Sequence, residues 1–282
     1  MIARAFGNGF PAVPIVGQGT WNVPLRAGAR EEAIRALQAG IDLGMVHIDT
    51  AEMYGDGGAE TLVGEAIAGL PRERLFLVSK VLPQHATYEG TLKACHASMK
   101  RMRVDYLDCY LLHWRGSVPL AETMRALEKL VADGAIRSLG VSNFDIGDLR
   151  EAQSLLKREK IACNQVLYHL GERSIETHEI PFCREAGIAT VAYTPFGKGD
   201  WRDSPGAKEL QRIAAAHKTS AHAVILAFLT RDDLTFAIPK ASTVAHVEEN
   251  AAGGRLRLTA DDIAAVDRAF PVKRRRGGLP TL

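Results

Sequence analysis

The sequence contains few cysteines and no long apolar run. Its 282 residues include four cysteines, none in a C-x-x-C pair or a Cys/His spacing typical of a zinc site. We therefore expect reduced thiols, a cytoplasmic location and no bound metal. Residues 1–9 lack the apolar core of a signal peptide. No apolar run approaches the ~18–20 residues of a membrane span, so no membrane association is expected.

The sequence also lacks an excess of charge of one sign. Lys and Arg number 35, Asp and Glu number 33, and the formal net charge is +2. This balance provides no electrostatic attraction to nucleic acid or to an anionic membrane, so neither is an expected partner. The exception is a basic run, Lys-Arg-Arg-Arg at residues 273–276, which we interpret as a solvated tail.

A glycine-rich dinucleotide-binding turn is missing as well. An open doubly wound sheet would carry G-x-G-x-x-G after an early strand, but Gly17-Gln18-Gly19 leads to Trp21 and Pro24 instead of into a helix. Short apolar runs alternate with amphipathic segments, as in a parallel sheet buried on both faces. This pattern predicts a single-domain (β/α)8 TIM barrel over residues 1–282, with a short N-terminal segment before the first strand. The predicted strands are 15–19, 45–49, 75–80, 107–113, 136–141, 162–166, 188–193 and 234–239.

Two of the predicted helices have clear boundaries. Pro119 suits the first turn of one helix, and Asp133-Gly134 ends it. Asp145 is the predicted N-cap of the next helix.

Polar residues follow the predicted strands. In a barrel, the C-terminal ends of all strands meet at one rim, where barrel enzymes hold their active sites. A polar residue at one strand end usually only begins a loop, but seven successive polar ends favour a functional rim. These residues are Asp49, Lys80, His113, Ser142 with Asn143, Gln165, Tyr193 and Lys240.

Four side chains at this rim form a coherent acid–base group. A phenol such as Tyr54 titrates near ~10, and an ammonium such as Lys80 lowers that pKa. Asp49 can hold Lys80 charged and in place, while His113 can orient a carbonyl oxygen. Two simpler interpretations stay open, namely that Asp49 and Lys80 form a plain ion pair and that Tyr54 is only a rim residue.

Eight segments lie at or near the ends of the predicted strands. They begin with GQGTW (17–21), IDTAEMY (48–54), VSKV (78–81) and YLLHW (110–114), and continue with GVSNF (140–144), NQVLY (164–168), AYTPF (192–196) and IPKAS (238–242). In this order they resemble the aldo-keto reductase family, and in particular its bacterial members that act on methylglyoxal and similar aldehydes. The resemblance implies that Tyr54 is the general acid, tuned by Lys80 and Asp49, and that His113 orients the substrate. It also implies that Trp21 and Trp114 line the substrate pocket.

The same resemblance implies a nicotinamide cofactor bound across the barrel mouth. Ser142, Asn143 and Gln165 would bind the nicotinamide carboxamide, and Tyr193 would stack on its ring. Further cofactor contacts would come from Thr20, Trp21, Pro195, Phe196, Lys240, Ser242, Thr243, His246, Glu249 and Asn250.

The residues expected to bind the adenosine end of the cofactor depart from the family pattern. Lys240 would approach the 2′-phosphate, but His246 occupies the position of an Arg that normally clamps it. A neutral imidazole does not replace the planar guanidinium, so NADP(H) is favoured through Lys240, with NAD(H) as the alternative.

Other functions remain open. A non-catalytic nicotinamide-binding barrel, such as a redox sensor or channel subunit, would keep the cofactor residues but could lose Tyr54 or Lys80. A metal-dependent barrel would need clustered ligands at the strand ends. Alcohol oxidation would use the same site in reverse. The predicted partner is a small carbonyl compound, and a monomer is the family expectation. The loop after Tyr193 and the C-terminal tail are short, which suggests an open or small pocket.

Overall fold

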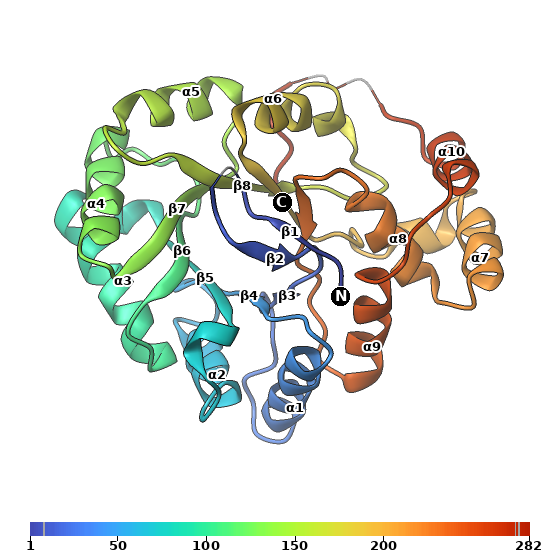
Figure 1. Cartoon of the computed structure of the whole chain (residues 1–282), viewed down its shortest axis with the longest axis horizontal. Coiled ribbons are helices and arrows are strands. Elements are labelled where there is room, and N and C mark those ends of the chain that lie inside the picture. The colour runs from blue at the N-terminus through green and yellow to red at the C-terminus, as the bar shows by residue number, and fades with distance from the viewer. Residues whose placement is uncertain (8, 274, 276) are drawn as a thin grey trace.

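The computed structural model describes residues 1–7, 9–273, 275 and 277–282. Strands and helices alternate along the chain, and Figure 1 shows the helices as an outer ring around the strands. Eight strands form one parallel sheet in the order β3 to β10, so each strand pairs with its neighbour in sequence. They are β3 (Gln18–Gly19), β4 (His47–Asp49), β5 (Phe76–Val81), β6 (Leu107–Leu112), β7 (Ile136–Ser142), β8 (Ile161–Leu167), β9 (Ala189–Tyr193) and β10 (Thr235–Ala237).

The first and last strands of this sheet also contact each other. The Gly17 amide donates to the Ala237 carbonyl at 2.8 Å, and the Ala237 amide donates to the Ile15 carbonyl at 2.9 Å. A further bond joins the Gly19 amide to the Pro239 carbonyl at 3.0 Å. The sheet therefore returns on itself, and all eight predicted strands are present in the α/β arrangement expected of a (β/α)8 barrel.

The helices connect the strands by crossovers. Asp145 accepts a hydrogen bond from the Asp148 amide at 2.8 Å, so its predicted N-cap role is confirmed. Pro119 differs slightly from expectation, because it lies at the cap and not in the first turn. The helices are α1 (Ala29–Asp42), α2 (Gly58–Ala66), α3 (Tyr88–Met102), α4 (Leu120–Ala132), α5 (Ile146–Leu155), α6 (Glu179–Ala186), α7 (Ala207–Ala216), α8 (Ala221–Leu229), α9 (Val244–Gly253) and α10 (Ala260–Ala269).

The N-terminal segment before the barrel has secondary structure of its own. It forms an antiparallel hairpin of β1 (Ala3–Ala5) and β2 (Ala12–Pro14), which lies across the middle of the ring in Figure 1. Between the two strands Phe6 is fully buried, with its ring centroid 4.8 Å from that of Phe76 and 5.1 Å from that of Phe236. Because Phe76 begins β5, the hairpin covers the N-terminal end of the barrel, opposite the rim of polar residues.

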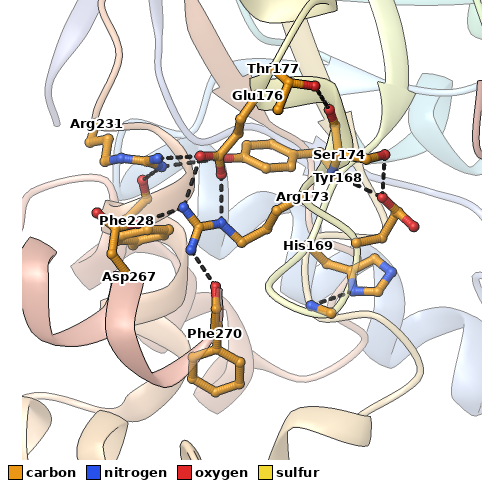
Figure 2. A network of polar contacts seen from close by, with 12 residues as sticks. Tyr168, His169, Arg173, Ser174, Glu176, Thr177, Phe228, Arg231, Asp267 and Phe270 are labelled. Atoms are coloured by element: carbon orange, nitrogen blue, oxygen red, sulfur yellow. Dashed lines mark hydrogen bonds and ion pairs between the residues drawn. The ribbon is translucent and has the colours of Figure 1, made fainter. Parts of the chain in front are cut away.

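A buried polar network fastens the C-terminal helix to the barrel wall (Figure 2). The Glu176 carboxylate accepts from Arg173, from Arg231 at 2.8 Å and from the Tyr168 hydroxyl at 2.6 Å. Arg173, only 3% exposed, also donates to Asp267 at the end of α10. Because buried charges are stable only when paired, this network determines where the chain leaves α10 and turns back towards the rim.

The basic tail was predicted to be solvated, which is wrong for Arg275. Its guanidinium lies 2.7 Å from the Glu179 carboxylate of α6, and the Glu179 side chain is 3% exposed. Arg274 and Arg276 lie outside the described residues.

Candidate active site

A cavity of about 830 Å³ opens at the C-terminal ends of the strands. Residues from seven of the eight strand ends line it, together with residues of the loops that follow them. Most of the side chains that the sequence predicted for catalysis and cofactor binding are among them. The predicted residues that line it are Thr20, Trp21, Asp49, Tyr54, His113, Trp114, Ser142, Asn143, Gln165, Tyr193, Pro195, Phe196 and Lys240.

Lys80 lies beneath this cavity and is fully buried. Its ammonium donates to Asp49 Oδ1 at 2.6 Å, to the Thr50 carbonyl at 2.7 Å and to Tyr54 Oη at 3.3 Å. These three acceptors use all the protons of the ammonium. The predicted group of Tyr54, Lys80 and Asp49 is therefore one hydrogen-bonded unit, and Asp49–Lys80 is more than an isolated ion pair.

Burial dominates the titration of this unit. It raises the pKa of the Tyr54 hydroxyl, while the Lys80 charge opposes the rise without reversing it. Burial also disfavours the charged form of Lys80, but Asp49 and Tyr54 together raise its pKa. The expected lowering of the Tyr54 pKa by Lys80 is present only as a partial compensation. At neutral pH Tyr54 therefore keeps its proton and Lys80 its charge.

His113 stands beside Tyr54 with the two ring centroids 5.7 Å apart and nearly perpendicular. Burial, and to a lesser extent the Lys80 charge, lowers the pKa of His113 to about 3. The imidazole is therefore neutral at physiological pH. A neutral imidazole has one N–H, which can be donated to a carbonyl oxygen without competing for the Tyr54 proton.

Amide and hydroxyl groups gather on the opposite wall. Ser142 Oγ donates to the Gln165 carbonyl at 2.9 Å, and Gln165 Nε2 donates to Asp49 Oδ2 at 2.8 Å. The Tyr193 hydroxyl donates to Asn143 Oδ1 at 2.9 Å. Asn143 has a φ of 59°, a left-handed conformation that Asn tolerates better than most residues. Gln165 thus contacts the hydrogen-bonded unit of Tyr54, Lys80 and Asp49 directly, a link that strand spacing alone did not reveal.

The loop that carries Tyr54 is held by a residue without a predicted role. Glu52 Oε1 accepts from the Leu82 amide at 2.7 Å and lies 3.0 Å from His85 Nδ1. Both partners follow β5, the strand that carries Lys80. Glu52 therefore fixes the spacing between Tyr54 and Lys80 from outside the cavity.

Five predicted cofactor residues lie outside the cavity. They come after Lys240, whose ammonium donates to Ser242 Oγ at 3.0 Å. Thr243 caps α9 through the His246 amide, so its hydroxyl has a structural partner. The His246 side chain is exposed, and Glu249 pairs with His222. The five residues are Ser242, Thr243, His246, Glu249 and Asn250.

The sequence analysis also missed several wall residues. The short C-terminal tail suggested an open or small pocket, and in the structure Thr281 and Leu282 of this tail line the cavity. Leu282 lies close enough that its backbone affects the Tyr193 hydroxyl, whose pKa burial raises to about 12. Periodicity cannot place such a tail because no regular element carries it. Other wall residues without a predicted role are Asn22, Met53, Arg115 and Thr194.

Within the part of the chain that the structure describes, no three His, Cys, Asp or Glu side chains are grouped as for a metal ion. No helix in that same part is both long and apolar enough to span a bilayer.

Comparison with known proteins agrees with this geometry. The aldo/keto reductase family pattern matches residues 15–270. Methylglyoxal reductase YeaE of Escherichia coli (strain K12) is 45% identical, covering 96% of each chain. Glyoxal reductase of Bacillus subtilis (strain 168) is 37% identical over 84% of this chain and 83% of its own. An aldo-keto reductase from Klebsiella pneumoniae, solved in complex with NADPH, superposes with a TM-score of 0.92, at 43% identity and full coverage of both chains.

The chain belongs to the aldo/keto reductase family. It is an oxidoreductase, as the resemblance implied, and the predicted cofactor, NADP(H), is the one held by a close structural neighbour.

Proposed function

We propose that the protein reduces small aldehydes and ketones to alcohols with NADPH, taking methylglyoxal-like and aromatic aldehydes as substrates. The observation that carries this proposal is the contact of Tyr54 Oη with the Lys80 ammonium at 3.3 Å, inside a cavity that admits a small molecule. The curated relatives named for methylglyoxal and glyoxal reduction support the substrate class.

The residues on the cavity wall fit a nicotinamide. A carboxamide needs both donors and acceptors, which the side chains of Ser142, Asn143 and Gln165 provide at the ends of two adjacent strands, β7 and β8. The half-buried Tyr193 ring lies beside them and offers a flat apolar face. When bound, the reduced nicotinamide supplies the hydride.

The proton comes from the protein. Tyr54 holds it at neutral pH because burial raises its pKa. As the carbonyl oxygen gains negative charge it takes the proton from Tyr54 Oη, and the Lys80 ammonium stabilises the phenolate that remains. The neutral His113 donates a hydrogen bond that directs the carbonyl oxygen, and Asp49 keeps Lys80 in place.

The mouth of the cavity is apolar. Trp21, Met53 and Trp114 line it, and each is more than a third exposed. Such aromatic and thioether surfaces bind flat or small apolar groups without a specific polar partner. This supports a broad range of small and aromatic aldehydes.

Cofactor choice would depend on Lys240. Replacing it with Ala removes a charge at the cavity edge, so we expect a larger rise in KM for NADPH than for NADH, about tenfold against little change. Steady-state kinetics with both cofactors measure this. Equal changes would mean that Lys240 does not bind the 2′-phosphate.

Tyr54→Phe tests the catalytic assignment. The change deletes the hydroxyl and keeps the ring, so turnover should fall by about 10²–10⁴-fold while the dissociation constant for NADPH stays within about twofold. Tyr88→Phe on α3 is the matched control and should leave both unchanged. Near-normal kcat in Tyr54→Phe would refute the acid assignment.

The same experiment separates the enzyme from a non-catalytic nicotinamide-binding barrel, which would bind NADPH without turnover in the unmodified protein. We further propose that residues 1–282 form one domain that acts as a monomer in the cytoplasm. The four buried, unbridged thiols support a reducing compartment.

A further inference from the structure

The loop between β9 and α7 forms one wall of the cavity and packs against α8. Thr194, Pro195, Phe196 and Gly197 line the cavity. The loop continues through a 3-10 helix, Asp200–Asp203, before α7 begins. This wall is held in place by residues other than Tyr54, Lys80, Asp49 and His113.

Three residues of this loop converge on one side chain of α8, that of His222. The Phe196 ring meets the imidazole edge-on with centroids 4.9 Å apart, and the Trp201 ring meets it at 5.3 Å. Arg202 Nη2 lies 2.9 Å from His222 Nε2. On the other side of the imidazole, Nδ1 lies 3.0 Å from the Glu249 carboxylate of α9. His222 thus joins the loop to two helices.

The hydrogen-bond chemistry of these contacts defines one protonation state. A guanidinium has donors only, so Nε2 of His222 must accept from Arg202 through its lone pair. A carboxylate accepts only, so Nδ1 must carry the proton that is donated to Glu249. Both bonds form together only when the imidazole is neutral, with its proton on Nδ1.

Protonation of His222 would remove its hydrogen bond to Arg202. A second proton on Nε2 would point at the Arg202 N–H groups, so an attraction becomes a repulsion between two cations. The hydrogen bond to Glu249 would survive, so His222 would stay bound to α9 but would no longer hold the loop. The charged groups near the imidazole are Arg202 on the loop with Glu249 and His246 on α9. Burial, with Arg202 and His246, lowers the pKa of His222 more than Glu249 raises it, in agreement with a neutral ring at pH 7.

We propose that His222 is a positioning residue that holds residues 194–204 against α8 while it is neutral, and that releases this loop when it is protonated. The consequence for a bound dinucleotide rests on the proposed function. With the wall released, NADPH would dissociate faster, and acid would accelerate its release.

The first test measures the loop without any cofactor. Hydrogen exchange of peptides covering residues 194–204 is followed at pH 7.5 and pH 5.0, after correction for the chemical exchange rate. His222→Phe keeps a flat ring between Phe196 and Trp201 but removes both hydrogen bonds. The matched control is His217→Phe, because His217 also bonds a carboxylate, that of Asp262 at 2.8 Å, whereas among the described residues its side chain has no hydrogen bond to residues 194–204.

We expect loop exchange in His222→Phe to be about fivefold faster or more at pH 7.5, the effect of losing a hydrogen bond of typical net strength. Exchange in the unmodified protein should be faster at pH 5.0 than at pH 7.5, whereas His222→Phe should show no further change. The His217 control should behave as the unmodified protein. Unchanged exchange over β6 in every sample excludes global unfolding. Equal loop exchange in His222→Phe and the unmodified protein at pH 7.5, or an acid effect that persists in His222→Phe, would overturn the proposal.

The second test follows NADPH dissociation by stopped-flow quenching of tryptophan fluorescence. His222→Phe should release NADPH about fivefold faster at pH 7.5. A release rate equal to that of the unmodified protein, with a faster-exchanging loop, would overturn the link to the cofactor. Absence of NADPH binding in every protein would contradict the proposed function, while the exchange experiment would still decide the role of His222.

Discussion

His47 offers a test of how burial controls the charge of this barrel. It begins β4 at the N-terminal end of the sheet and is 1% exposed. Its ring packs edge-on against those of Phe6 and Phe76, with centroids 5.6 Å and 5.3 Å away. Among the described residues neither ring nitrogen has a hydrogen-bond partner. Burial, with a smaller contribution from the Lys80 charge, lowers the pKa of His47 to about 3.

A lowered pKa makes stability depend on pH. The unfolded chain takes up a proton near pH ~6.5, while the folded protein takes it up only near pH 3. The contribution of His47 to the free energy of unfolding is therefore fully present above the pKa of the unfolded chain. It is lost as the pH falls towards the pKa of the folded protein. Linkage gives a loss of about 2 kcal/mol between pH 7 and pH 5.

His47→Leu removes the titrating group and keeps a similar volume. At pH 7 we expect a change in the free energy of unfolding within about 1.5 kcal/mol, since repacking opposes the removal of two unpartnered nitrogens. The free energy of unfolding of the variant, relative to that of the unmodified protein, should be about 2 kcal/mol higher at pH 5 than at pH 7. Urea unfolding at both pH values measures this, with the exposed His96→Leu as control. An identical difference at the two pH values would refute the assignment of a neutral, buried His47.

Two further predictions concern packing away from the cavity. Glu176→Gln leaves the buried Arg173 and the partly buried Arg231 short of a counter-charge, so it should destabilise the protein by about 3 kcal/mol in chemical denaturation. Glu209→Gln, in an exposed pair, should cost less than about 1 kcal/mol. An equal effect of the two would contradict the role of the network in Figure 2. Phe6→Ala should cost about 3–5 kcal/mol, measured the same way, because its ring closes the barrel end; a loss below about 1 kcal/mol would mean that the hairpin is dispensable.

The sequence predicted the parts of the fold that repeat. Buried parallel strands are continuous apolar runs, so all eight could be found, and polar residues at their ends had to meet at one rim because the strands are parallel. That reasoning brought Asp49, Lys80, Tyr54 and His113 together correctly. It did not give the net direction of the Tyr54 pKa, because the balance between burial and the Lys80 charge depends on packing.

The features that the sequence did not predict are contacts between distant, irregular segments. The three-residue strands β1 and β2 are too short for a periodic pattern. The tail reaches the cavity through the turn after α10, which the Arg173 network directs. The pairing of Arg275 with Glu179 and the bridge at His222 likewise join residues far apart in sequence. Such contacts follow from the completed barrel and leave no local signal.

The most direct test of the central claim is the loss of reduced-nicotinamide absorbance when the protein is mixed with NADPH and methylglyoxal, with an aromatic aldehyde and with NADH in parallel. We expect rapid oxidation of NADPH by both aldehydes in the unmodified protein and its near-absence in Tyr54→Phe. Comparable rates with NADH would show that the His at position 246 has relaxed cofactor choice. No oxidation of either cofactor, in protein shown to bind NADPH, would contradict the claim that this site is a carbonyl reductase.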